Sequence, residues 1–150
     1  MSTTSDSTTA IRKTRSVPLA PDAAFELFTT RMGSWWPLDS HALSPDASDV
    51  RWDDHVGGRV VELDADGNEY PWAEITVWDP PRRLALAWHL DRDRSTATTV
   101  DVRFEPAGDG CTVCLEHGGW ENMGDTGAEA RAGYTEGWEP VLDLLVEAAG

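Results

Sequence analysis

The sequence is poor in positive charge. It has 12 Lys and Arg residues against 27 Asp and Glu, which gives a formal net charge of -15 with its 4 His neutral. A surface of this sign repels phosphate backbones and anionic lipid headgroups. We therefore expect neither a nucleic-acid partner nor docking on a membrane.

Long apolar runs are also missing. No stretch approaches the roughly 18 residues that a membrane span needs, and residues 1–10 lack the basic start and apolar centre of a signal peptide. The 2 Cys cannot form a disulfide framework, which agrees with a reducing compartment. These absences predict a cytoplasmic protein.

The length of the chain limits how many hydrophobic cores it can form. A chain of 150 residues can bury one sizeable core, and no linker or internal repeat divides it. Residues 1–10 are mostly Ser, Thr and Asp, so they cannot offset their ordering entropy and are expected to form a disordered tail. We expect a single domain over residues 11–150.

The first half of the domain combines a strand, short helices and a loop. Residues 11–19 alternate in the extended pattern of a strand, and Pro21 and Asp22 are typical of a helix start. This helix is expected to end at Gly33, and a second short helical segment to end at the tryptophan pair that follows. Residues 38–48 lack a period and are expected to form a loop.

Six further strands are indicated by period-two alternation between residues 50 and 117. Asp66 and Gly67 predict a two-residue hairpin turn between two of them. With the first strand, the count is about seven antiparallel strands in a meander.

A long amphipathic helix is predicted for residues 126–149. Apolar side chains recur there at spacings of three and four, at Tyr134, Trp138, Val141, Leu142, Leu145 and Ala149. Gly137 and Pro140 should bend this helix or split off its first turns. A sheet with one apolar face and a helix with one apolar stripe predict an α+β helix-grip fold. In this fold the curved sheet wraps the helix and encloses a space.

Several ordered segments resemble a known family. They are APDAAFELFTT, SWWP at residues 34–37, VGGR at 56–59, TVWDPPRRLALAW at 76–88, VRFEPAGDGCTVCLEHGGW at 102–120, and Tyr134 with the Gly-Trp pair at 137–138. Together they resemble the SRPBCC (START-like) superfamily, and within it the family related to the C-terminal domain of the activator of heat-shock protein 90 ATPase.

The resemblance, which covers about residues 11–149, implies a helix-grip fold with a cavity between the sheet and the C-terminal helix. In the superfamily such cavities typically take hydrophobic small molecules, and relatives include lipid carriers, hormone receptors and aromatase/cyclases. The eukaryotic co-chaperones carry an additional N-terminal domain, for which this chain has no room.

Three sequence patterns that could bind metals or act in redox chemistry have simpler interpretations. Cys111 and Cys114 lie in a strand, where an odd separation points them to opposite faces. Residues 64–69 lack the remaining ligands of a calcium loop and fit a hairpin turn better. Residues 53–55 precede a double glycine and are interpreted as solvated turn residues. No metal site and no cofactor are expected.

The candidate binding residues are mainly aromatic. His117 shares the parity of Val113 and Leu115, so an ionisable ring faces the apolar side of the sheet, either as a satisfied core histidine or as a ligand contact. Eight Trp residues are many for this length; most are expected in the wall and core, and the candidates among them either pack or line a pocket for an aromatic or lipid-like guest. The predicted ligand-binding residues are Trp36, Trp88, His117, Trp120, Tyr134 and Trp138. A polar anchor could come from Glu62, Glu74 or Arg51, whose inward faces the pattern does not assign.

No catalytic residue is assigned, because nucleophile elbows, phosphate-binding loops and metalloprotease motifs are absent. The main hypothesis is a non-enzymatic binding protein for a hydrophobic, lipid-like or aromatic, small molecule. The alternatives are a chaperone-interacting ATPase activator and an aromatase/cyclase-like enzyme that uses His117 or a strand carboxylate as acid or base. A monomer and a homodimer are both compatible with the sequence.

Overall fold

The computed structural model describes residues 10–90 and 92–150, so the predicted tail lies outside the described residues except for Ala10. Seven antiparallel strands form one sheet in the order β1-β7-β6-β5-β4-β3-β2, which confirms the predicted meander. The strands are β1 (Ile11–Val17), β2 (Ala47–Trp52), β3 (Arg59–Asp64), β4 (Glu69–Asp79), β5 (Arg83–Trp88), β6 (Thr98–Ala107) and β7 (Gly110–Gly118).

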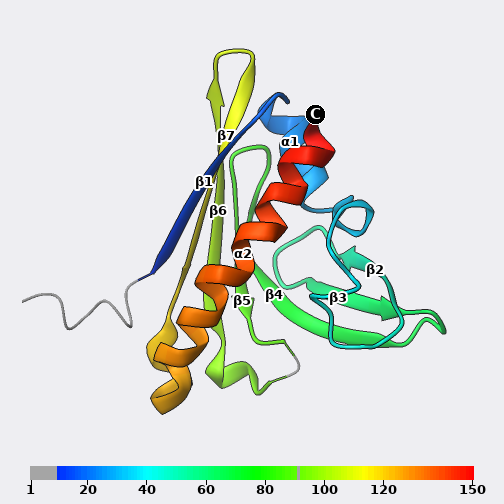
Figure 1. Ribbon diagram of the computed structural model, residues 1–150, viewed down its shortest axis with the longest axis vertical. Helices are drawn as coiled ribbons and strands as arrows, with labels where there is room; N and C mark the ends of the chain where they lie inside the picture. The colour runs from blue at the N-terminus through cyan, green and yellow to red at the C-terminus, as the bar shows by residue number, and fades with distance from the viewer. Residues whose placement is uncertain (1–9, 91) are drawn as a thin grey trace, which may run out of the picture.

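The sheet is curled, and the α-helices lie on its concave side (Figure 1). Register shifts interrupt the ladders between Ala47 and Asp49, between Val60 and Val61, and between Ile75 and Val77. Such bulges bend a strand and increase its twist. They are confined to the ladders of β2 to β5, so this end of the sheet turns away from β1 and leaves room under the long helix.

The first helix is shorter than the sequence predicts. α1 (Pro21–Phe28) begins at the predicted proline but ends at Phe28, because Thr29 caps its last turn through its backbone N–H and its hydroxyl. Gly33 lies beyond it, in the 3₁₀ turn η2 (Met32–Ser34). A Cβ on Gly33 would stand 1.8 Å from Asp49 Oδ1 and 3.1 Å from the Val50 backbone nitrogen, so glycine favours the close approach of η2 to β2.

The long helix is not divided. After the 3₁₀ segment η4 (Trp120–Thr126), α2 runs continuously from Gly127 to Ala149, so of the two effects expected of Gly137 and Pro140, a bend or a split, the split does not occur. The apolar stripe explains the continuity, because Trp138 and Val141 on either side of Pro140 are both buried in the core. Packing of the helix face therefore outweighs the backbone hydrogen bond that proline removes.

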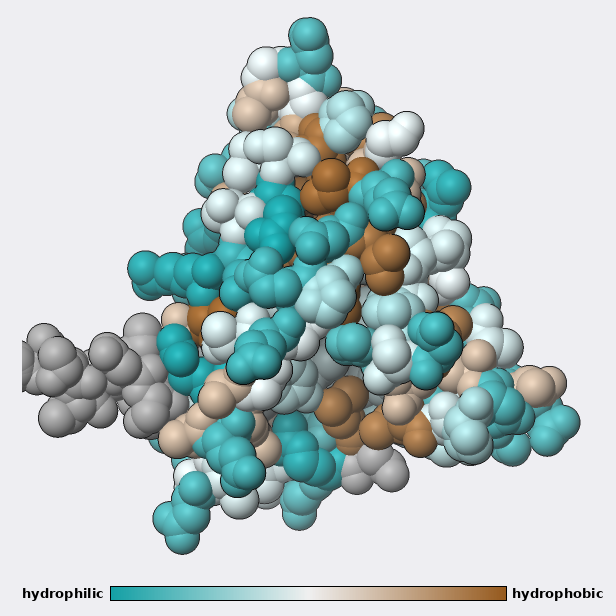
Figure 2. Space-filling model, viewed as in Figure 1, coloured by the Kyte–Doolittle hydropathy of each residue, from teal (hydrophilic) through white to brown (hydrophobic). Residues whose placement is uncertain are grey.

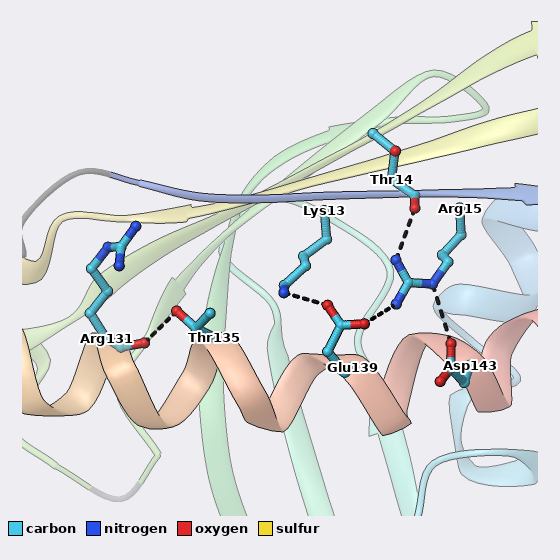
Figure 3. Close-up of polar contacts among 7 residues, drawn as sticks. All are labelled: Lys13, Thr14, Arg15, Arg131, Thr135, Glu139 and Asp143. Atoms are coloured by element: carbon cyan, nitrogen blue, oxygen red, sulfur yellow. Dashed lines mark hydrogen bonds and ion pairs between the residues drawn. The ribbon is translucent and has the colours of Figure 1, made fainter. Parts of the chain in front are cut away.

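The C-terminal half of α2 is attached to β1 by ion pairs (Figure 3). Lys13 and Arg15 both pair with Glu139, and Arg15 also reaches Asp143 at 3.4 Å. The hydrogen bond from Lys13 and, to a smaller extent, the one from Arg15 hold the pKa of Glu139 below its ordinary value. These contacts place the C-terminal half of α2 directly on β1.

The hairpin between β3 and β4 forms at the predicted place but is longer than two residues. The N–H of Gly67 donates to Asp64 O, and Gly67 has a φ of 85°, as expected of a three-residue loop that ends in a left-handed glycine. Asp64 stabilises it further by accepting bonds from two backbone N–H groups, the Asn68 amide and the Tyr70 hydroxyl.

Candidate functional site

A cavity of about 510 Å³ lies between α2, the curled end of the sheet and the loop before β2. Its volume is within the range of about 300–1,000 Å³ that is typical of small-molecule sites. On the face drawn in Figure 2, hydrophobic side chains reach the surface beside α2, although most of that face is hydrophilic. The lining residues are Trp36, Ser40, His41, Ala42, Leu43, Trp72, Trp88, Leu90, Ala130, Gly133, Tyr134, Gly137, Trp138 and Val141.

Four indoles border the cavity, and each contacts the next in a closed circuit, which we call the tryptophan ring. The centroids of Trp36 and Trp72 are 5.0 Å apart, and those of Trp72 and Trp88 are 5.7 Å apart. Trp138 closes the circuit at 6.0 Å from Trp88 and 6.1 Å from Trp36. These separations and tilted planes are the favourable geometry for aromatic pairs.

Every N–H of the tryptophan ring is donated to a protein acceptor. Trp36 bonds His41 O at 2.8 Å, and Trp72 bonds Glu62 Oε1 at 3.0 Å. Trp88 bonds the Tyr134 hydroxyl at 2.9 Å, and Trp138 bonds His117 Nδ1 at 3.0 Å. The four rings are therefore fixed in orientation and offer the cavity only their aromatic surfaces.

Glu62 anchors the loop that forms one wall. Its carboxylate is fully buried and accepts bonds from the backbone N–H groups of Leu43 and Ser44, the Ser44 hydroxyl and the Trp72 indole. Burial alone would raise the pKa of Glu62, but these donors outweigh burial and bring that pKa below its ordinary value. Glu62 thus orients Trp72 and holds Leu43 and Ser44 without lining the cavity itself.

The other two residues considered as polar anchors are on the surface. Glu74 pairs with Arg94 at 3.0 Å, and Arg51 pairs with Glu69 at 2.9 Å. Neither residue lines the cavity.

His117 lies behind the cavity lining. It is fully buried, and its Nδ1 must accept from Trp138 because an indole N–H can only donate. Nε2 then carries the hydrogen and donates to the Thr98 hydroxyl at 2.7 Å. Burial, with a smaller contribution from Arg92, lowers the pKa of His117 to about 3. A neutral ring with both nitrogens occupied is a satisfied core histidine, so the idea that His117 acts as an acid or base does not fit this geometry.

The structure brings together four of the six predicted binding residues at the cavity: Trp36, Trp88, Tyr134 and Trp138. Trp120 lies with His117 outside the lining, fully buried, and donates its indole N–H to His117 O at 3.0 Å. Both rings pack on Tyr134, with centroids 5.5 Å and 4.8 Å from it, so they support a lining residue from behind.

Sequence reasoning missed the loop and the glycines of the lining. Ser40 and His41 follow no period, and they are held by backbone bonds to Pro37 O and by the Trp36 indole that donates to His41 O. Gly133 and Gly137 lie one helical turn apart, and a Cβ on either would meet nothing within 4 Å. Their mid-helix position, away from a cap or turn, is the one sequence signal that could have indicated them.

The other candidate chemistries have structural explanations. Cys111 and Cys114 are free thiols in β7, one buried and one half-buried, and burial raises the pKa of both. Carboxylate oxygens of Asp46, Asp64 and Asp66 lie within 4.8 Å of one another. The Asp64 oxygens already accept the four hydrogen bonds that order the hairpin, so the proximity follows from the turn.

The sequence matches a known protein family. Residues 18–150 match the family described as Activator of Hsp90 ATPase homolog 1-like protein. The chain belongs to this family. No helix among the described residues is long and apolar enough to cross a membrane. No curated protein sequence matches the chain.

Three solved structures illustrate its relatives. The anthrahydroquino-γ-pyrone synthase Txn09, solved in complex with SUM, is 34% identical, with 93% of this chain and 96% of that chain covered and a TM-score of 0.66. The Aha1 dimer from Colwellia psychrerythraea is 17% identical over 93% and 95% of the two chains, with a TM-score of 0.66. CalU16 from Micromonospora echinospora is 20% identical over 91% and 73%, with a TM-score of 0.64. The last two show the shared fold.

Proposed function

We propose that this protein binds an aromatic small molecule in the cavity under α2. The observation that carries the proposal is the tryptophan ring, whose four indoles present aromatic surfaces and no free N–H to the cavity. Aromatic pairs gain about 0.5–1.5 kcal/mol beyond area burial, so such a site favours an aromatic guest over an aliphatic chain.

The helix wall favours a flat guest. Gly133 and Gly137 leave the α2 backbone bare where a side chain would otherwise fill the cavity. A planar ring system can lie against this bare backbone and still contact the indoles. The net charge of -15 disfavours an anionic guest, so we propose a neutral one.

The relatives support this choice between the functions open to the family. Txn09, at 34% identity over nearly the whole of both chains, is named as a synthase of a fused aromatic product. The family description refers to activation of a chaperone ATPase. An aromatic-lined cavity has a direct use in binding a small molecule, which is why we favour that function over the chaperone hypothesis.

The proposal is tested by quenching of tryptophan emission with neutral 2-(hydroxymethyl)anthraquinone. We expect saturable quenching of the wild type and none of Gly137→Leu, whose side chain would enter the cavity. Calorimetric titration gives a second readout that does not depend on fluorescence. Absence of saturable binding across a panel of polycyclic aromatics, or undiminished binding by Gly137→Leu, would overturn the proposal.

A second candidate is an enzyme of the aromatase/cyclase type that acts on the same guest. It is favoured by the identity to Txn09 and by His41, whose Nδ1 lies 2.8 Å from the Ser40 hydroxyl at the cavity. His41 would then take the role of acid or base that His117 cannot fill. Chromatography of hydroxylated aromatic ketones incubated with the protein tests this: a product lost in His41→Asn supports it, and binding without any product rejects it.

A further inference from the structure

The polar groups that the cavity offers a guest are few. Apart from the indoles, whose N–H groups are all occupied, the polar side chains among the described lining residues are Ser40, His41 and Tyr134. Ser40 and His41 are hydrogen-bonded to each other. Tyr134 is therefore the polar side chain of the lining from which a hydrogen bond to a guest is best defined.

The Tyr134 hydroxyl is arranged as a donor. Its oxygen accepts the N–H of Trp88 at 2.9 Å, and no acceptor for its own hydrogen lies within bonding distance among residues 10–90 and 92–150. Burial raises the pKa of Tyr134, although the Trp88 hydrogen bond and the charge of Arg92 act in the opposite direction. The phenol is thus protonated at neutral pH, and the Trp88 bond polarises it toward donation.

The position of this donor is fixed before a guest arrives. The Tyr134 ring contacts His117 at 4.8 Å and Trp120 at 5.5 Å between centroids, and its oxygen is held by Trp88. Gly133 precedes it and Gly137 lies almost one turn later, so the bare stretch of helix backbone and the Tyr134 side chain line the same cavity. A flat guest against that backbone would present its edge to the hydroxyl.

We infer that Tyr134 donates a hydrogen bond to a carbonyl oxygen of the guest, so that the cavity selects planar aromatic ketones and quinones over aromatic hydrocarbons of the same shape. This inference rests on the proposed function and names its ligand class. His117 and Trp120 contribute as positioning residues, through the orientation that they give Tyr134.

The test compares two neutral probes of matched shape, 2-(hydroxymethyl)anthraquinone and 2-(hydroxymethyl)anthracene. One neutral hydrogen bond corresponds to a preference of about 2- to 12-fold for the quinone. We expect the wild type to show this preference and Tyr134→Phe to lose it. Tyr70→Phe is the matched control, because Tyr70 is the only other tyrosine and bonds Asp64 in the remote hairpin.

A second measurement does not depend on a variant that could lose its fold. The carbonyl stretching band of the quinone bound to the wild type should move to lower wavenumber than in a dry apolar solvent. An unshifted band, or an unchanged quinone preference in folded Tyr134→Phe, overturns the inference while the aromatic-binding function stands. Failure of both probes to bind the wild type removes the proposed function instead.

Discussion

The Trp138 indole donates a hydrogen bond to His117 Nδ1 at 3.0 Å, and this contact joins a residue that lines the cavity to one that lies behind the lining. Trp138 comes from α2 and turns its ring to the cavity, whereas His117 comes from β7 and stays behind it. The bond also fixes the imidazole as the neutral form with hydrogen on Nε2. A buried group that must remain neutral makes stability depend on pH.

Acidification should destabilise the protein through His117. Its pKa falls from an ordinary 6.5 to about 3 on folding, so the unfolded state binds a proton first. The stabilisation is full above about pH 6.5 and is lost as pH falls toward 3. Linkage predicts that the free energy of unfolding is about 2 kcal/mol lower at pH 5 than at pH 7.

Urea unfolding at the two pH values measures this difference. His117→Asn retains a hydrogen-bonding side chain without a titratable ring, so it should show a much smaller change over the same interval. A variant with the full pH dependence of the wild type would assign the effect to other groups.

Removal of the Trp138 ring should be costly. Its side chain is buried in the core, contacts Trp36 and Trp88, and satisfies His117. Trp138→Ala should lower the free energy of unfolding by about 3–5 kcal/mol, as is typical for emptying a large aromatic site. Denaturant unfolding checks this, and a loss below about 1 kcal/mol would contradict the burial described above.

Glu62 should be essential to the cavity wall without contacting a guest. Glu62→Gln replaces one acceptor oxygen by an amide that faces backbone and hydroxyl donors, so unfolding should become easier by about 2–4 kcal/mol. Guest affinity should fall as well, because the bonds to Leu43 and Ser44 hold the loop. Glu74→Gln, on the exposed part of β4, is the control and should leave binding unchanged. Equal effects of the two substitutions would refute this role.

Substitutions at Gly137 should change the stability of the fold and the binding of the guest independently. Gly137→Ala places a methyl group where nothing lies within 4 Å, so helix propensity predicts a gain of about 1 kcal/mol in stability. Gly137→Leu should fold equally well and lose the guest. Gly127→Ala provides the contrast, because its Cβ would stand 2.3 Å from the backbone oxygen of Trp120 and reduce stability. Thermal unfolding measures all three variants, and destabilisation by Gly137→Ala would show that the space is filled.

The sequence by itself determined the elements and, for β5, β6, β7 and α2, their inward faces. Period-two alternation located the strands, the stripe from Tyr134 to Ala149 located α2, and Asp66 with Gly67 located a hairpin. These features follow from local periodicity, because the side chains that a strand or helix buries are set by its own geometry. The parity argument also placed His117 correctly on the apolar face.

Only the tertiary structure decided which apolar-face residues meet the cavity. His117 obeys the same period-two pattern as Trp88, yet it lies with Trp120 behind Tyr134 because α2 crosses above them. The loop residue Leu43 is held at the cavity by Glu62, which accepts its N–H from 19 positions away. Contacts between distant segments depend on sheet curl and helix placement, and no local period encodes either of these.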